Sequence, residues 1–182
     1  MPGVRLYENK DKPYVQKVCL ENAGKGIINA DYRKFILTMF CNYYIECEPE
    51  NCFVATDDND IAIGYTICAK NFDAYIKRFM KEYFPDIPAK YKAGAVAEIF
   101  AHAIFRKKYP AHLHIDISDK FQRRGLGHKL IDALTEALKE YDVHSVMLVV
   151  GSGNEQGRNF YKKYGFSEIA NLSAGIAMGI KF

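Results

Sequence analysis

Two short stretches of this chain combine residue types that could do chemistry. The first is AHLHIDIS, residues 111–118, whose alternating pattern predicts a β-strand with His112, His114, Asp116 and Ser118 on one face. Four polar side chains on one face of a central strand indicate a polar cavity or a buried hydrogen-bonded network. The same spacing could present ligands to a metal ion such as zinc, although no Cys pair or HExxH motif supports a metal site.

The second stretch is FQRRGLG, residues 121–127, which is followed at once by a helical pattern. Backbone amides at a helix N-terminus lack intrahelical partners and lie at the positive end of the helix dipole, so they suit a phosphate. Gly125 and Gly127 would let the backbone approach an anion closely, and Arg123 and Arg124 would add positive charge. A basic turn that binds no ligand is the alternative.

The elements that must position these residues follow from periodicity. The pattern predicts a mixed α/β fold with strands over 4–8, 52–56, 61–69, 111–118, 144–151, 166–170 and 174–182. It predicts helices over 11–24, 31–46, 72–83, 93–109, 125–140 and 155–165. Asn71 could cap the third of these helices, and Pro85 and Pro88 would end it.

The overall composition is that of an ordinary globular protein. A length of 182 residues indicates a single domain, 1–182, and a net charge of +3 gives no case for nucleic-acid binding. The five cysteines show no CxxC pair and are interpreted as free thiols, although Cys47 and Cys52 could bridge. Because the chain shows no signal-type or membrane-spanning apolar run, we expect a cytoplasmic protein that does not bind membranes.

Taken together, the two stretches resemble the GNAT superfamily of N-acetyltransferases. Gln122, Gly125 and Gly127 match that family's Arg/Gln-x-x-Gly-x-Gly/Ala loop, which binds the pyrophosphate of acetyl-CoA after the fourth strand. Asn154 matches an Asn after the fifth strand that approaches the pantetheine or acyl end. Tyr161, four residues before Gly165, matches a Tyr that protonates the departing thiolate. The segment YPAHLHIDI, residues 109–117, also looks like the acetyltransferase-like domain at the end of O-GlcNAcases.

The resemblance implies a GNAT fold, acetyl-CoA as co-substrate and a set of site residues. The cofactor would lie beside the backbone of the fourth strand and on the loop that follows it. The implied cofactor-binding residues are Ile115, Asp116, Ile117, Gln122, Arg123, Arg124, Gly125, Leu126, Gly127, His128, Asn154 and Tyr161. Tyr161 is also the expected general acid, and no bound metal is expected.

The general base is not indicated by the family pattern. Many relatives carry a Glu five residues before the Asn, but this chain has Val149 there, and 144–151 contains no carboxylate. An ammonium must lose its proton before it can attack, so a base must come from elsewhere. Asp116 and His114 are the candidates on the fourth strand, and Glu98 could also reach the site.

About 40 residues, 71–110, separate the third and fourth strands and form a predicted helical insertion. The insertion could cover the acceptor side and select a small amine, or it could form a homodimer surface. We expect an enzyme that transfers acetyl from acetyl-CoA to a primary amine, more readily of a small molecule than of a protein. The alternative is a non-catalytic module of the same fold that binds or senses acyl-CoA.

Overall fold

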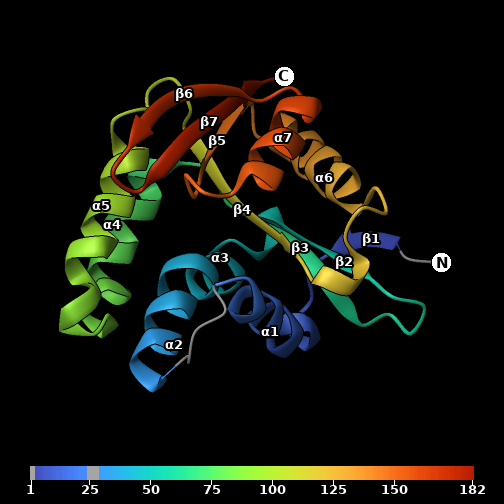
Figure 1. Ribbon diagram of the computed structural model, residues 1–182, viewed down its shortest axis with the longest axis horizontal. Helices are drawn as coiled ribbons and strands as arrows, with labels where there is room; N and C mark the ends of the chain where they lie inside the picture. Colours follow the sequence, from blue (N-terminus) through green and yellow to red (C-terminus); the bar gives the residue numbers. More distant parts are fainter. Residues whose placement is uncertain (1–2, 24–28) are drawn as a thin grey trace.

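A seven-stranded sheet forms the centre of the molecule and carries helices on both faces (Figure 1). The computed structural model describes residues 3–23 and 29–182. In sheet order the strands are β1 (Gly3–Leu6), β2 (Cys52–Thr56), β3 (Ala62–Ala69), β4 (Ala111–Ile117), β5 (Ser145–Val150), β7 (Gly175–Lys181) and β6 (Ser167–Leu172). Neighbouring strands are antiparallel except β4 and β5, which run parallel. This arrangement confirms the predicted mixed α/β architecture.

The helices fall close to their predicted ranges. They are α1 (Lys12–Asn22), α2 (Ala30–Leu37), α3 (Tyr43–Cys47), α4 (Phe72–Glu82), α5 (Lys92–Ala103), α6 (Leu126–Glu140) and α7 (Glu155–Tyr164). In the described part of the chain, none of these helices has the length and apolar character needed to cross a bilayer.

One face of the sheet is covered by α6 and α7 (Figure 1). The apolar side of α6 is fully buried and packs with Leu113 of β4 and Val146 of β5 in one core cluster. The leucines at 126, 130, 134 and 138 recur every fourth residue, so they lie on one side of the helix, as predicted. Because α6 is held rigidly on the sheet, its N-terminus lies in a fixed place beside the end of β4.

The opposite face is covered by α1, α2 and α3 (Figure 1). The predicted continuous helix over 31–46 is interrupted, because Thr38–Asn42 forms a π-helical segment between α2 and α3. A π segment widens the helix and so changes the direction of the side chains that follow it. Tyr44, the second residue of α3 after the segment, lies buried against β4.

The insertion over 71–110 forms α4 and α5, which stand side by side at the end of the molecule away from β1 (Figure 1). Of the two helices, α5 contacts β5. Asn71 caps α4 as predicted, because its side-chain oxygen accepts a hydrogen bond from the Ala74 amide at 2.9 Å. The predicted helix over 93–109 is too long. It ends at Ala103, and turns occupy most of the segment that leads to Tyr109, which is buried in the core.

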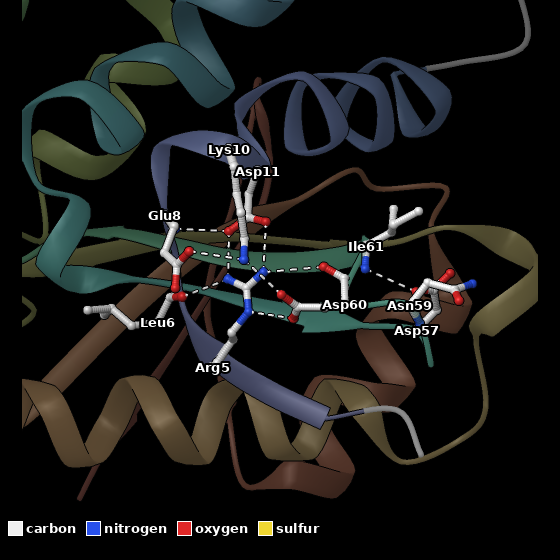
Figure 2. Close-up of polar contacts among 9 residues, drawn as sticks. All are labelled: Arg5, Leu6, Glu8, Lys10, Asp11, Asp57, Asn59, Asp60 and Ile61. Carbon is white, nitrogen blue, oxygen red and sulfur yellow. Dashed lines mark hydrogen bonds and ion pairs between the residues drawn. The ribbon is translucent and has the colours of Figure 1, made fainter.

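The edge of the sheet at β1 is held by a polar clamp (Figure 2). The Arg5 guanidinium donates to both carboxylate oxygens of Asp11 at 2.7 and 2.9 Å and to Asp60 at 2.8 Å. Lys10 donates to the other oxygen of Asp60 at 2.8 Å. Asp11 is only 1% exposed, so these contacts compensate for the burial of its charge and tie β1 to the turn between β2 and β3.

The five cysteines are all free, which confirms the interpretation made from their spacing. The Cys47 sulfur lies 3.1 Å from the Tyr83 hydroxyl, and Cys52 is fully buried. The bridge that the sequence left open between these two residues is therefore not formed.

Candidate functional site

A cleft of about 720 Å³ opens where the end of β4, the loop after it and the N-termini of α6 and α7 meet. Most of the predicted cofactor-binding residues line it. From β4 and the loop these are Ile115, Asp116, Ile117, Gln122, Arg123 and Gly125, and from the two helices and their approaches Leu126, Gly127, His128, Asn154 and Tyr161. The structure therefore gathers into one concave surface these predicted residues, which lie up to 46 positions apart in the chain.

The first wall of the cleft is backbone. β4 and β5 pair only at Ala111 with Val146 and at His112 with Met147, and the two strands then separate. The Ser118 amide donates to the Ile63 carbonyl of β3, so alternation turns the backbone of Ile115 and Ile117 away from β3. The amides of both residues and the carbonyl of Ile115 thus face the side where β5 would otherwise continue, which is a suitable edge for an extended amide-containing ligand, while the Ile117 carbonyl accepts a hydrogen bond from Gln122.

The second wall is the glycine loop. Gly125 has φ of +77°, a left-handed conformation that glycine adopts without strain, and a Cβ built there would meet open space. Gly127 is needed for a different reason, because a Cβ there would lie 2.8 Å from Cζ of Phe160 on α7. The loop thus exposes the first amides of a 15-residue helix to the cleft.

Side chains of the loop hold its shape. Gln122 donates to the carbonyl of Ile117 at 2.9 Å and to Asp119 at 3.0 Å, which ties the loop to the end of β4. Arg123 has φ of +62° and lines the cleft. Arg124, predicted as a partner of the diphosphate, lies outside the cleft lining, because it donates to the Lys120 carbonyl and stacks on Phe121. Of the two arginines of the loop, Arg123 is therefore the one that brings positive charge to the cleft.

Two predicted residues belong to α7 or its cap. Asn154 caps the helix, because its side-chain oxygen accepts a hydrogen bond from the Gly157 amide at 2.8 Å. Tyr161 packs against Phe160 and Phe166, and burial raises the pKa of its phenol above its usual value, with a smaller contribution from Asp116. A phenol with a raised pKa keeps its proton at neutral pH, which suits a proton donor.

Asp116 lines the same cleft as Tyr161. Its Oδ2 accepts a hydrogen bond from the hydroxyl of Tyr65 on β3 at 2.5 Å. Burial raises the pKa of Asp116 from 3.8 to about 7, although the Tyr65 hydrogen bond acts in the opposite direction. A carboxylate with a pKa near 7 is well matched to proton abstraction at neutral pH.

His114 points to the same face of β4 but does not line the cleft. Its Nε2 lies 3.0 Å from the Tyr44 hydroxyl, which also lies 3.1 Å from Nε2 of His112. Burial, helped by the neighbouring His102, lowers the pKa of His114 from 6.5 to about 3, so the ring is neutral and weakly basic. The two histidines thus form the buried network that the sequence offered as an alternative.

The remaining candidates are also placed. Ser118 donates to Glu21 of α1 at 3.1 Å, and Glu98 lies 3.4 Å from His102 within the insertion. The part of the chain that the structure describes contains no group of three or more His, Cys, Asp or Glu arranged to hold a metal ion. In the same part of the chain, no residue of the insertion lines the cleft.

Sequence reasoning missed several residues of the site. Phe160 and Gln156 of α7 and Asn22 at the end of α1 line the cleft, and Tyr65 binds Asp116 from outside it. The α7 residues could have been found from the helical pattern, because Gln156 lies on the N-terminal turn and Phe160 one turn later. Asn22 and Tyr65 carried no local signal, because their contacts depend on which elements pack against β4.

Several solved structures have the same fold as this chain. The crystal structure of SsHAT superposes with a TM-score of 0.85 at 28% identity, over 99% of this chain and 98% of that chain. PaiA N-acetyltransferase from Thermoplasma acidophilum, solved with coenzyme A, gives 0.64 at 15% identity over 100% and 99%. YncA from Salmonella typhimurium, solved with acetyl-CoA, gives 0.61 at 14% identity over 100% and 94%. Residues 26–166 match the acetyltransferase (GNAT) family, and the chain therefore belongs to this family of acetyl-CoA-dependent acetyltransferases.

Proposed function

We propose that this enzyme transfers acetyl from acetyl-CoA to the primary amine of a small molecule by direct attack. The observation that carries the proposal is that Asp116 and Tyr161 face one cleft beside the unpaired edge of β4. One group accepts protons near neutral pH and the other keeps its proton. Acetyl transfer to an amine needs this pair of properties.

The loop and the strand would hold the co-substrate in place. The amides from Arg123 to His128 would bind the diphosphate, with Arg123 adding charge at the helix N-terminus. The pantetheine arm would lie along the backbone of Ile115 and the amide of Ile117, in place of a strand partner. An amide of this edge would donate to the thioester carbonyl oxygen and stabilise the negative charge that develops on it.

Acetyl transfer would then proceed in three proton and bond changes. The Asp116 carboxylate takes one proton from the ammonium form of the acceptor, which leaves a neutral amine. The amine nitrogen forms a bond to the thioester carbon, and the carbon–sulfur bond breaks. The Tyr161 hydroxyl gives its proton to the departing sulfur, and the second proton of the acylated nitrogen passes to the Tyr161 oxygen, so that the products are an N-acetyl amide and CoA thiol with Tyr161 protonated again. No acetyl group is attached to the protein at any stage.

Asp116 is favoured over His114 as the base for two reasons. Asp116 lines the cleft and His114 does not. The pKa of about 7 also lets Asp116 both accept and release a proton near neutral pH, whereas a pKa of about 3 makes His114 a poor acceptor. The proposal that the acceptor is a small molecule is supported by the partial burial of Asp116, which an amine must reach between the end of α1 and β4.

The test is an acceptor screen with the purified chain. Diamines, amino sugars, amino acids and lysine-containing peptides would be incubated with acetyl-CoA, and thiol release and product mass would be measured. N-acetylation of a small amine, with Asp116→Asn at least 100-fold slower, is the expected result. Preference for the peptides would overturn the small-molecule proposal. Acetyl-CoA binding without turnover of any amine would instead support the non-catalytic sensing module.

A further inference from the structure

Tyr65 is a buried residue that the reaction described above does not use. It lies on β3 directly opposite Asp116, and the two residues are register partners. Its side chain is fully buried, so it does not reach the cleft. Its hydroxyl nevertheless donates to Asp116 Oδ2 at 2.5 Å, which is a short, charge-assisted hydrogen bond when Asp116 is ionised.

This contact gives the two carboxylate oxygens of Asp116 different environments. Oδ2 is occupied by Tyr65, and Oδ1 has no hydrogen-bond partner among the described residues. Burial raises the pKa of the Tyr65 phenol well above 10, so the hydroxyl can donate but does not lose its proton. The carboxylate is thus held in one orientation from behind, with one oxygen available for a proton.

The other titratable groups around this pair do not carry charge that could replace the contact. Cys41 of the π-helical segment and Tyr161 of α7 have pKa values that burial and their neighbours raise, and His114 on the same strand is neutral. Cys19 of α1 is the remaining titratable group near Tyr65. The Tyr65 hydrogen bond is the one favourable contact to the ionised carboxylate that the described residues provide, and it opposes the effect of burial on the Asp116 pKa.

We propose that Tyr65 is a positioning residue of the acetyl transfer, which fixes the Asp116 carboxylate and stabilises its ionised form so that Oδ1 takes the proton of the amine. The inference rests on the proposed role of Asp116 as the base. In each turnover Oδ1 gains one proton from the acceptor and gives it back to water, while the Tyr65 proton stays on its own oxygen. Tyr65 therefore acts through Asp116 and touches neither substrate.

The test is the pH profile of kcat/KM for Tyr65→Phe, measured with the best amine from the screen. Without the hydrogen bond the ionised carboxylate is less stable, so the acidic limb of the profile should move to higher pH by about one unit. Activity should fall about fivefold at pH 7, because the ionised fraction of Asp116 drops from about one half to about one tenth, and it should stay within about threefold of the wild type at pH 9. The KM for acetyl-CoA should not change.

Tyr44→Phe is the matched control. Tyr44 is also a buried tyrosine facing β4, but it binds His112 and His114 instead of Asp116. Its removal should leave the acidic limb in place. An unshifted limb in Tyr65→Phe, a loss that is the same at every pH, or an equal shift in Tyr44→Phe would each overturn the proposal.

A second readout does not depend on turnover. The Asp116 carboxyl carbon can be titrated by NMR in the wild type and in Tyr65→Phe, and the pKa should be higher in the variant. If no amine is acetylated by the wild type, the proposed function fails while this titration still tests the contact. If Tyr65→Phe does not fold, Tyr65 would instead be replaced by 3,5-difluorotyrosine. Its hydroxyl is a stronger hydrogen-bond donor, so the pKa of Asp116 should be lower than in the wild type. An unchanged pKa would overturn the proposal.

Discussion

Replacing Asp116 by asparagine should make this protein more stable at neutral and alkaline pH while removing its activity. Asparagine has nearly the same shape, and its side-chain oxygen can still accept the hydrogen bond from Tyr65. It cannot ionise, so it avoids the cost of a partly buried charge. The free energy of unfolding of the variant should therefore exceed that of the wild type by an amount that depends on pH.

The magnitude follows from the two pKa values. The pKa of Asp116 is about 7 in the folded chain against an ordinary 3.8, so between these values the unfolded chain has lost a proton that the folded chain keeps. Wild-type stability falls across this window by about 1.36 kcal/mol per pH unit. The advantage of Asp116→Asn should be near zero at pH 3, about 1.6 kcal/mol at pH 5 and about 4 kcal/mol at pH 8, where it levels off.

Urea unfolding followed by circular dichroism at pH 5 and pH 8 would measure this difference. Asp11→Asn is the control, because Asp11 is a buried carboxylate with a partner, bound by Arg5 at 2.7 and 2.9 Å. That substitution should destabilise the protein by roughly 2 kcal/mol at both pH values. An Asp116→Asn variant that is no more stable than the wild type at pH 8, or whose advantage does not change with pH, would show that burial does not raise the pKa of Asp116.

Four further predictions concern single positions. Tyr161→Phe should lower kcat roughly 100-fold with little change in the KM for acetyl-CoA, and an unchanged kcat would remove Tyr161 as the acid. Gly125→Asp should bind acetyl-CoA roughly 10- to 100-fold more weakly in calorimetry than Gly125→Asn, which tolerates the same φ without the charge. Equal affinities would place the diphosphate elsewhere. Gly127→Ala should lower the free energy of unfolding by roughly 1–3 kcal/mol through contact with Phe160, and Phe160→Leu in the same chain should restore part of it. The stability of His114→Gln relative to the wild type should rise by about 2 kcal/mol between pH 7 and pH 5, because the wild type must keep a neutral His114 below pH 6.5. A constant difference would contradict the neutral state of this ring.

Much of the fold could be predicted because it follows from local patterns. The leucines of α6, the alternation along β4 and the Asn71 cap of α4 all report their structure through neighbouring residues. The errors occur where local preference is overruled. The π-helical segment cannot be seen in the periodicity of 31–46, and α5 ends early because the chain must turn to bury Tyr109.

In the site, too, some features could be predicted from local sequence and others could not. The loop from Gln122 to His128 is a contiguous motif, so its place at the mouth of α6 was predictable. The choice between Asp116 and His114 was not, because it depends on residues far away in the chain. Tyr65 is 51 positions from Asp116, and Tyr44 is 70 positions from His114. Which side chain lines the cleft and which bonds to the Tyr44 hydroxyl is decided by the packing of α3 and β3 on β4.

One rate comparison tests directly whether Asp116 is the general base. With an amine that the enzyme acetylates, CoA release would be measured at pH 8 for the wild type and Asp116→Asn, and acetyl-CoA affinity would be measured for both. The variant should have a rate at least 100-fold lower, an unchanged dissociation constant for acetyl-CoA and a more stable fold. A variant that folds, binds acetyl-CoA and turns over like the wild type would contradict the assignment of Asp116 as the base.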